Sequence, residues 1–205
     1  PVVPQSGALG ASGDLIPLAH IALVVMGEGQ AEFNGTVMPG ASALQGAEIT
    51  PLELQAKEGL ALLNGTQAMC AMAALLFADG KALCKVADIA GAMSIDATLS
   101  SRVPCDEGIH ALRPYPGSVA SAANVRMLLA GSQILASHEH CKRVQDPYSL
   151  RCLPQVHGAT REALTHAGEM LEIEMNAATD NPLVLEDGRV VSGGNFHGQP
   201  IALRM

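Results

Sequence analysis

Apolar residues recur at helical spacing along most of the chain, which predicts a mainly α-helical protein. A first run follows Asp14 and places Leu15, Leu18, Ala22 and Val25 on one side of a helix. Asp79-Gly80 is typical of a helix end, and Pro182 ends the last long helical pattern. We expect one helix that begins near residue 14 and further helices over about 52–77, 81–100, 117–138 and 154–177.

Two segments depart from the helical pattern. Residues 34–50 are rich in glycine and polar residues and predict a surface connection. Residues 183–191 show two short apolar runs around Glu186-Asp187-Gly188-Arg189, which predicts a β-hairpin. We therefore expect one unit over 1–205, with a loop at 1–13, a helical core at 14–182, and a hairpin followed by the start of another helix at 183–205.

Composition narrows the classes of protein to which the chain can belong. The net charge of −8 and the lack of a basic run argue against nucleic acid or a membrane surface as partner. The apolar run 68–78 is too short to span a bilayer. Five cysteines, an odd number without a C-x-x-C pair, favour a reducing, cytoplasmic location. With 48% hydrophobic residues and no Trp, we expect closely packed helices and apolar surface shared between subunits.

The tripeptide Ala11-Ser12-Gly13 offers unusual backbone chemistry. Gly13 lacks a Cβ, so its amide nitrogen can approach the carbonyl of Ala11 and close a five-membered ring. Loss of water from the ring and from Ser12 then leaves an electron-poor alkene. A flexible or helix-capping turn is the alternative interpretation of so short a string.

Polar strings inside apolar segments supply further candidates. Asn64 interrupts an apolar helix and can donate a hydrogen bond to a ring carbonyl, or can belong to a buried kink. Tyr148 and Arg151 share a helical face; Tyr148 can transfer a proton and Arg151 can bind a carboxylate, or both can belong to a surface helix entry. Phe196 lies in a Gly-rich turn that can line a pocket or cap the last helix.

The segment Ser137-His138-Glu139-His140-Cys141 has metal-ligand residue types but unfavourable spacing. Side chains at i and i+2 do not share a helical face, so we expect no metal site there.

Five strings in order resemble the aromatic amino acid ammonia-lyases over the whole chain. They are G-A-L-G-A-S-G-D-L-I-P-L-A-H, E-G-L-A-L-L-N-G-T-Q, Q-D-P-Y-S-L-R-C-L-P-Q-V, E-M-N-A-A-T-D-N-P-L-V and S-G-G-N-F-H-G. Within that family, S-H-E-H-C and Q-D-P-Y-S-L-R-C are most similar to the histidine ammonia-lyase branch.

The resemblance implies a long-helix bundle of the fumarase/aspartase-like ammonia-lyase type. It implies that Ala11-Ser12-Gly13 forms 4-methylidene-imidazole-5-one, the family's self-made electrophile, without metal or nucleotide. By the same likeness Asn64 and Tyr148 lie beside that ring, and Phe196 shapes its surroundings. Gln145 contacts the substrate, and Arg151 binds the substrate's carboxylate. The implied reaction is elimination of ammonia from L-histidine to give trans-urocanate.

The resemblance also implies that the chain is the central part of a longer homotetrameric enzyme. The family's proton-abstracting tyrosine is expected before residue 1, and the glutamate that selects the imidazole substrate after residue 205. We therefore expect the chain to be inactive alone. A phenylalanine or tyrosine ammonia-lyase, an aminomutase, and a non-catalytic helical assembly fragment remain alternatives.

Overall fold

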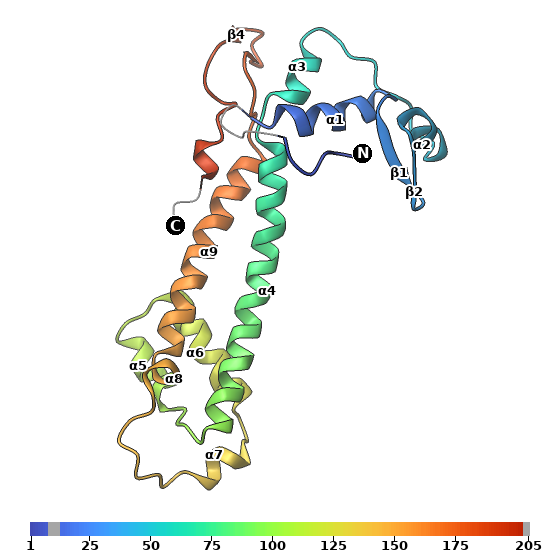
Figure 1. Ribbon diagram of the computed structural model, residues 1–205. Helices are drawn as coiled ribbons and strands as arrows, with labels where there is room; N and C mark the ends of the chain where they lie inside the picture. Colours follow the sequence, from blue (N-terminus) through green and yellow to red (C-terminus); the bar gives the residue numbers. More distant parts are fainter. Residues whose placement is uncertain (8–12, 203–205) are drawn as a thin grey trace. The chain divides into compact units, whose positions relative to one another are not determined.

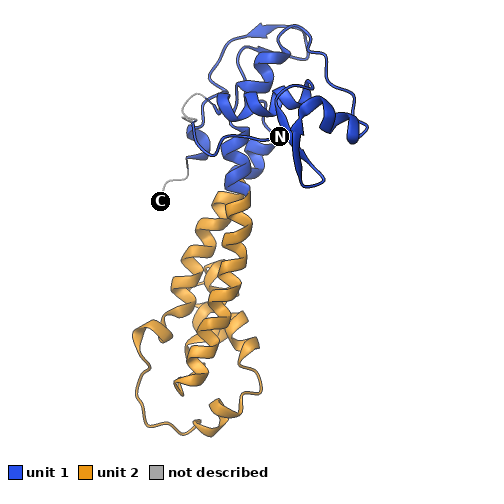
Figure 2. Ribbon diagram, turned by 45° about the vertical axis from the view of Figure 1, so that its right-hand side comes forward, with its two compact units in different colours: residues 1–74, 170–205 blue, residues 75–169 orange. Residues whose placement is uncertain are grey.

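The computed structural model describes residues 1–7 and 13–202, which fall into two compact units. Unit 1 comprises residues 1–74 and 170–205, and unit 2 comprises residues 75–169 (Figure 2). The chain passes from one unit to the other within two long helices, α4 and α9. The mainly helical fold class and the short hairpin near 183–191 are confirmed (Figure 1).

Unit 1 contains the shorter helices and both hairpins. Its elements are α1 (Leu15–Val25), β1 (Gln30–Phe33), β2 (Thr36–Pro39), α2 (Gly40–Gly46), α3 (Glu58–Leu63), β3 (Leu183–Val184), β4 (Val190–Val191) and the 3-10 turn η2 (Gln199–Ile201), with the start of α4 (Gln67–Ala97) and the end of α9 (Leu153–Met175). The sequence predicted the start of a further helix at the end of the chain. Residues 199–201 form a 3-10 turn, and residues 203–205 lie outside the described residues.

The surface connection predicted at 34–50 is wrong for most of its length. Asn34 and Gly35 both have positive φ and form the turn of the antiparallel β1–β2 hairpin, in which Phe33 pairs with Thr36. An Asn-Gly turn of this kind matches the twist of two strands. Helix α2 follows directly, and the apolar cluster of Val24, Ala31 and Ala43 holds it against the hairpin, with Phe33 and Met38 packed alongside.

Unit 2 is built on α4 and α9, which run antiparallel. Its other elements are η1 (Val103–Cys105), α5 (Glu107–Ala111), α6 (Pro116–Leu128), α7 (Gln133–Ser137) and α8 (Tyr148–Arg151). Its core joins α4, η1, α6 and α9 through Ala92, Ile95, Cys105, Ala122, Val125, Leu129 and Leu153. Burial raises the pKa of the Cys105 thiol to about 11, so this cysteine is a neutral core residue.

The helix end predicted at Asp79-Gly80 is also wrong, because α4 continues from Gln67 to Ala97. A Cβ on Gly80 would lie 3.0 Å from Leu164 of α9, and one on Gly168 would lie 2.7 Å from Phe77. These glycines allow two helices to approach closely, and that contact outweighs their poor helix propensity. The helix predicted at 117–138 is instead two helices, separated at Gly131, whose φ is +73°.

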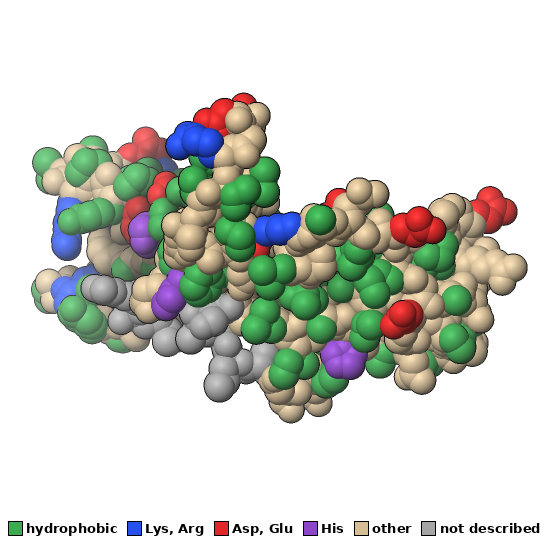
Figure 3. All heavy atoms as spheres, turned by 90° about the horizontal axis from the view of Figure 1, so that it is seen from above, with side chains coloured by type: hydrophobic (Ala, Val, Ile, Leu, Met, Phe, Trp, Pro, Cys, Tyr) green, Lys and Arg blue, Asp and Glu red, His purple; other side chains and the backbone are tan. Residues whose placement is uncertain are grey.

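Large hydrophobic side chains of α4 remain at the surface. Leu75, Leu76 and Leu83 are each 70% exposed. Hydrophobic side chains also reach the surface elsewhere in the molecule, as the view from above shows (Figure 3). The stretch 58–97 is long enough and apolar enough to cross a membrane, judged by length and composition only. Core helices of soluble proteins pass the same test. These apolar side chains are therefore not covered by the described part of the chain.

A buried carboxylate connects three helices of unit 2. Asp88 of α4 is 1% exposed and accepts hydrogen bonds from four side chains. The donors are Ser121 Oγ at 2.7 Å, Asn124 Nδ2 at 2.8 Å, His157 Nδ1 at 2.9 Å and Arg161 Nη2 at 2.6 Å. Burial raises the pKa of Asp88, but these hydrogen bonds and the charge of Arg161 outweigh that effect and hold it below its usual value.

The stability that Asp88 contributes is expected to depend on pH. Because the folded-state pKa is lowered, the contribution is present above the usual value of 3.8 and is lost as the pH falls through the folded-state pKa. The stability difference between the wild type and Asp88→Asn should therefore be constant near neutral pH and shrink below pH 3.8. Urea unfolding over a pH series measures it, and a difference that widens on acidification would contradict this assignment.

Candidate active site

The first part of the candidate site lies in unit 1, where the chain enters α1. Ala11 and Ser12 lie outside the described residues. Gly13 is buried with φ +87°, and a Cβ there would lie 2.6 Å from the carbonyl oxygen of Gly65. The amide nitrogen of Asp14 donates to that same oxygen at 2.7 Å. Position 13 therefore accepts only glycine, because both the backbone conformation and the available space exclude a side chain.

Asp14 joins this segment to the start of α4. Its side chain is 4% exposed, and Oδ2 accepts a hydrogen bond from the Met69 amide nitrogen at 2.7 Å. Met69 is in the first turn of α4, where backbone N–H groups lack partners within the helix and where negative charge is stabilised. A carboxylate 55 positions away in sequence thus caps α4 and fixes the chain directly after Gly13.

Asn64 lies at the C-terminal end of α3, next to Gly65. Its Nδ2 donates to Asp180 Oδ1 at 3.4 Å and to the carbonyl oxygen of Asn181 at 3.2 Å. The sequence hypothesis gives Asn64 a donor toward a ring carbonyl. In the structure its N–H groups are directed at residues 180 and 181, so the amide oxygen is the group left to accept.

The Gly-rich segment after β4 is joined to the same region. Asn181 Oδ1 accepts from the Gly193 amide nitrogen at 2.7 Å and from Ser192 Oγ at 3.2 Å. Asn195 Nδ2 donates to the carbonyl oxygen of Ala178 at 3.4 Å. Phe196 follows as a half-buried side chain. Unit 1 therefore connects the segments that carry Gly13, Asn64 and Phe196 through residues 178–181.

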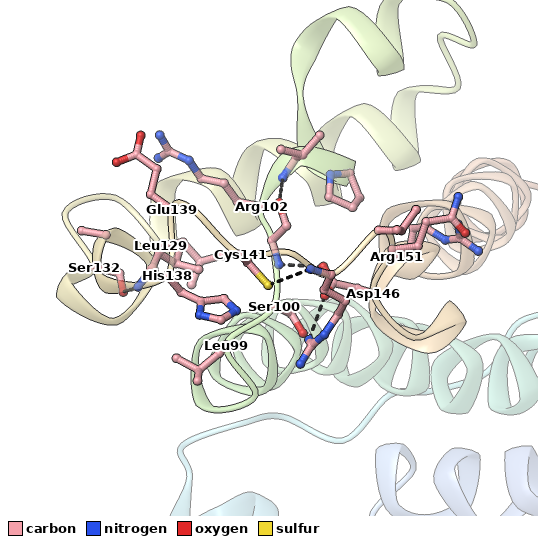
Figure 4. A pocket seen from close by; sticks show the side chains of 18 of the residues that line it. Leu99, Ser100, Arg102, Leu129, Ser132, His138, Glu139, Cys141, Asp146 and Arg151 are labelled. Atoms are coloured by element: carbon pink, nitrogen blue, oxygen red, sulfur yellow. Dashed lines mark hydrogen bonds and ion pairs between the residues drawn. The ribbon is translucent and has the colours of Figure 1, made fainter.

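The second part of the candidate site lies in unit 2, around α8. Gln145 and Arg151 line a cavity of about 1020 Å³, together with Arg102, His138 and Cys141 (Figure 4). Tyr148 begins α8 and is 74% exposed. Its phenol does not line this cavity, so the structure brings Gln145 and Arg151 together and leaves Tyr148 on the surface of unit 2.

The loop before α8 is fixed by Asp146. Its Oδ2 accepts from the Ser101 amide nitrogen at 2.7 Å, and its Oδ1 pairs with Arg143 Nη1 at 3.1 Å. These bonds hold Gln145 at the rim of the cavity. Within residues 1–7 and 13–202, no group of three or more His, Cys, Asp or Glu side chains is arranged to hold a metal ion.

Sequence reasoning missed two residues of unit 1. Asp180 is buried and forms an ion pair with Lys57, and neither was a candidate. Asp180-Asn181-Pro182 has the composition of an ordinary helix exit, which hid its role. The sequence feature that could have identified Asp180 is its position directly after a long apolar helix. A carboxylate that is buried at such a position needs hydrogen-bond or ion-pair partners.

Comparison with known proteins decides the family. The sequence model for aromatic amino acid lyases matches residues 1–205. The chain belongs to the aromatic amino acid lyase family. Among its relatives, the histidine ammonia-lyase of Sorangium cellulosum (strain So ce56) is 56% identical over 211 residues, which cover 100% of this chain and 41% of the relative. The histidine ammonia-lyase of Myxococcus xanthus (strain DK1622) is 55% identical over 206 residues, with the same two coverages.

Solved structures agree with this membership. A tyrosine aminomutase from Streptomyces globisporus matches this aromatic amino acid lyase chain with a TM-score of 0.84 and 40% identity, over 98% of this chain and 41% of that one. The histidine ammonia-lyase from Trypanosoma cruzi gives a TM-score of 0.83 and 40% identity, and the match covers 98% of this chain and 37% of that one. The chain thus spans about two fifths of the length of the relatives that it matches.

Proposed function

We propose that the chain is the central part of a histidine ammonia-lyase, which eliminates ammonia from L-histidine and gives trans-urocanate. The observation that carries the proposal is the identity of 55–56% to histidine ammonia-lyases over the whole chain. The matched segment includes the tripeptide that can cyclise and the candidate substrate residues. Cleavage of a carbon–nitrogen bond then makes the protein a lyase.

The surroundings of Gly13 fit the prosthetic group that the family implies. We propose that Ala11-Ser12-Gly13 forms 4-methylidene-imidazole-5-one, which would supply an electrophilic carbon that no ordinary side chain offers. Gly13 already has a positive φ, and its neighbour Gly65 leaves no room for a Cβ. Both features keep position 13 without a side chain, which is what ring closure by its amide nitrogen onto the Ala11 carbonyl requires. Asn64 and Phe196 would border the group from the same unit.

The residues of unit 2 would bind the substrate. Arg151 lines the cavity beside Gln145, and a guanidinium is suited to two parallel hydrogen bonds with a carboxylate. Gln145 would orient the bound amino acid from the rim. Tyr148 is exposed on its own unit and would meet the substrate or the ring only where further protein covers α8.

A chimera tests whether this segment carries the chemistry. The matched part of the Sorangium cellulosum relative is replaced by this chain, and ammonia release from L-histidine is measured. We expect release from the chimera and none from the matched variant Ser12→Ala, because the eliminated hydroxyl is absent. A folded chimera that releases no ammonia would contradict the proposal.

The chain by itself is expected to be inactive. It covers 41% of its relatives, so groups from outside residues 1–205 would have to complete the site. We propose a cytoplasmic homotetramer for the whole enzyme, in which other chains cover the exposed face of α4. Incubation of the 205-residue chain with L-histidine should give no ultraviolet signal of urocanate, and a measurable signal would overturn this prediction.

A tyrosine- or phenylalanine-specific lyase or aminomutase is the second candidate. It is favoured by the 40% identity to a tyrosine aminomutase. A full-length enzyme that carries this segment and acts on L-tyrosine in place of L-histidine would support it. A non-catalytic helical assembly fragment would be favoured instead if Ser12 remained an unmodified serine.

A further inference from the structure

Asp180 is a buried carboxylate to which the proposed chemistry gives no role. It is 8% exposed and follows the end of α9 in unit 1. Its Oδ2 forms an ion pair with Lys57 Nζ, and its Oδ1 accepts from Asn64 Nδ2 at 3.4 Å. The amide nitrogen of Asn181 donates to the same Oδ1 at 2.7 Å. Both carboxylate oxygens are therefore used, as a buried charge requires.

The partners of Asp180 stand at the two ends of one short helix. Lys57 is the residue before α3, and Asn64 is the residue after it. One carboxylate therefore holds both ends of a helix that is too short to be stable alone. Lys57 also has a φ of +76°, an uncommon value for a residue with a side chain. Its side chain is held by the ion pair with Asp180.

The end of α3 in turn positions the ring-forming segment. Asn64 precedes Gly65, whose carbonyl oxygen accepts from the Asp14 amide nitrogen at 2.7 Å. Gly65 also forms the wall against which Gly13 lies, without space for a side chain. A shift of Asn64 and Gly65 would therefore move the surface on which Gly13 rests.

We propose that Asp180 is a positioning residue that, with Lys57, fixes Asn64 and Gly65 against Gly13. This inference rests on the proposed function, because it assigns Asp180 a role in aligning the Ala11-Ser12-Gly13 segment for ring closure. Asp180 does not touch the reacting atoms. It acts through the orientation of the Asn64 amide and through the position of the Gly65 backbone.

Four variants of the 205-residue chain test the proposal. Asp180→Ala removes both acceptor oxygens, Asp180→Asn keeps one, and Lys57→Met removes the cation. Asp187→Asn is the matched control, because Asp187 is an exposed aspartate of the same unit that is paired with Arg189. Thermal unfolding first identifies the variants that are folded.

The first readout is hydrogen exchange of the Asn64 side-chain amide, followed by NMR. We expect exchange roughly tenfold faster in Asp180→Ala, an intermediate rate in Asp180→Asn and Lys57→Met, and the wild-type rate in Asp187→Asn. If Asp180 had a purely structural role, the variants would differ in unfolding temperature, but the exchange rates of the Asn64 amide would not follow this order. Wild-type exchange in folded Asp180→Asn, and in Asp180→Ala where it folds, would overturn the proposal.

The second readout is ring formation, measured as the loss of two waters from the peptide that contains residues 11–13. We expect the extent of ring formation to fall in the same order as the protection of the Asn64 amide. Unchanged ring formation in Asp180→Ala and Asp180→Asn would overturn the proposal. If the wild-type chain forms no ring, the proposed function fails for this chain, and the exchange of the Asn64 amide alone decides the role of Asp180.

Discussion

Replacement of Gly13 by alanine is expected to destabilise the protein by about 3 kcal/mol and to prevent ring closure. Two effects add at this position. The φ of +87° disfavours any side chain, and the new Cβ would lie 2.6 Å from the Gly65 carbonyl oxygen and 2.8 Å from its nitrogen. Backbone atoms cannot move aside as a flexible side chain does, so α1 and the Asn64–Gly65 segment must separate. Urea denaturation measures the loss.

Gly188 provides a matched control for the Gly13 variant. Its φ is +82°, but nothing lies within 4 Å of the position that a Cβ would take. Gly188→Ala therefore tests the backbone conformation without the clash, and we expect a loss of about 1 kcal/mol. Equal losses in the two variants would show that Gly13 is not held against Gly65.

Asp88→Ala is expected to destabilise the protein by about 3–5 kcal/mol. The substitution leaves Arg161 without its carboxylate and removes the acceptor of Ser121, Asn124 and His157. Loss of one partner costs more than a surface ion pair contributes, because the remaining groups are partly buried. The free energy of unfolding from urea denaturation checks this value.

Ser121→Ala is the matched control for Asp88. It removes one of the four donors and leaves the carboxylate paired with Arg161. We expect a loss of about 1 kcal/mol. A loss from Asp88→Ala that is no larger than this would mean that the network contributes as separate hydrogen bonds and does not hold α4, α6 and α9 together.

Strongly periodic segments were predictable from the sequence. The apolar stripe before Pro182 predicted a helix over 154–177, and α9 covers Leu153–Met175. The Glu-Asp-Gly-Arg turn predicted the β3–β4 hairpin. In both cases the signal is local, because periodicity and turn residues act over a few neighbouring positions.

The wrong predictions depended on contacts between distant segments. Asp79-Gly80 is typical of a helix end, but α4 continues through Gly80. Leu164 of α9 packs in the space beside Gly80 that a side chain would occupy, and this contact supports the continuous helix. The β1–β2 hairpin was missed even though Asn34-Gly35 is a strong turn signal, since the surrounding glycines suggested an irregular connection.

In the candidate site, too, local sequence strings identified some residues, whereas contacts between distant segments revealed the others. Gly13, Asn64 and Phe196 were found from strings within the sequence, and unit 1 connects their segments. Lys57 and Asp180 are 123 positions apart. Asp180 lies in one of the five strings, but nothing in the sequence pairs it with Lys57, so only the fold reveals their ion pair. Periodicity predicts elements, whereas the pairing of buried charges depends on how those elements pack.

The mass of one peptide tests the central claim most directly. The first Lys or Arg of the chain is Lys57, so trypsin releases residues 1–57 as a single peptide that contains Ala11-Ser12-Gly13. Ring closure and loss of the Ser12 hydroxyl remove two waters, so we expect this peptide to be about 36 Da lighter than its sequence mass. The Ser12→Ala peptide should keep its full mass. A wild-type peptide at full mass would contradict the claim that this chain builds its own electrophile.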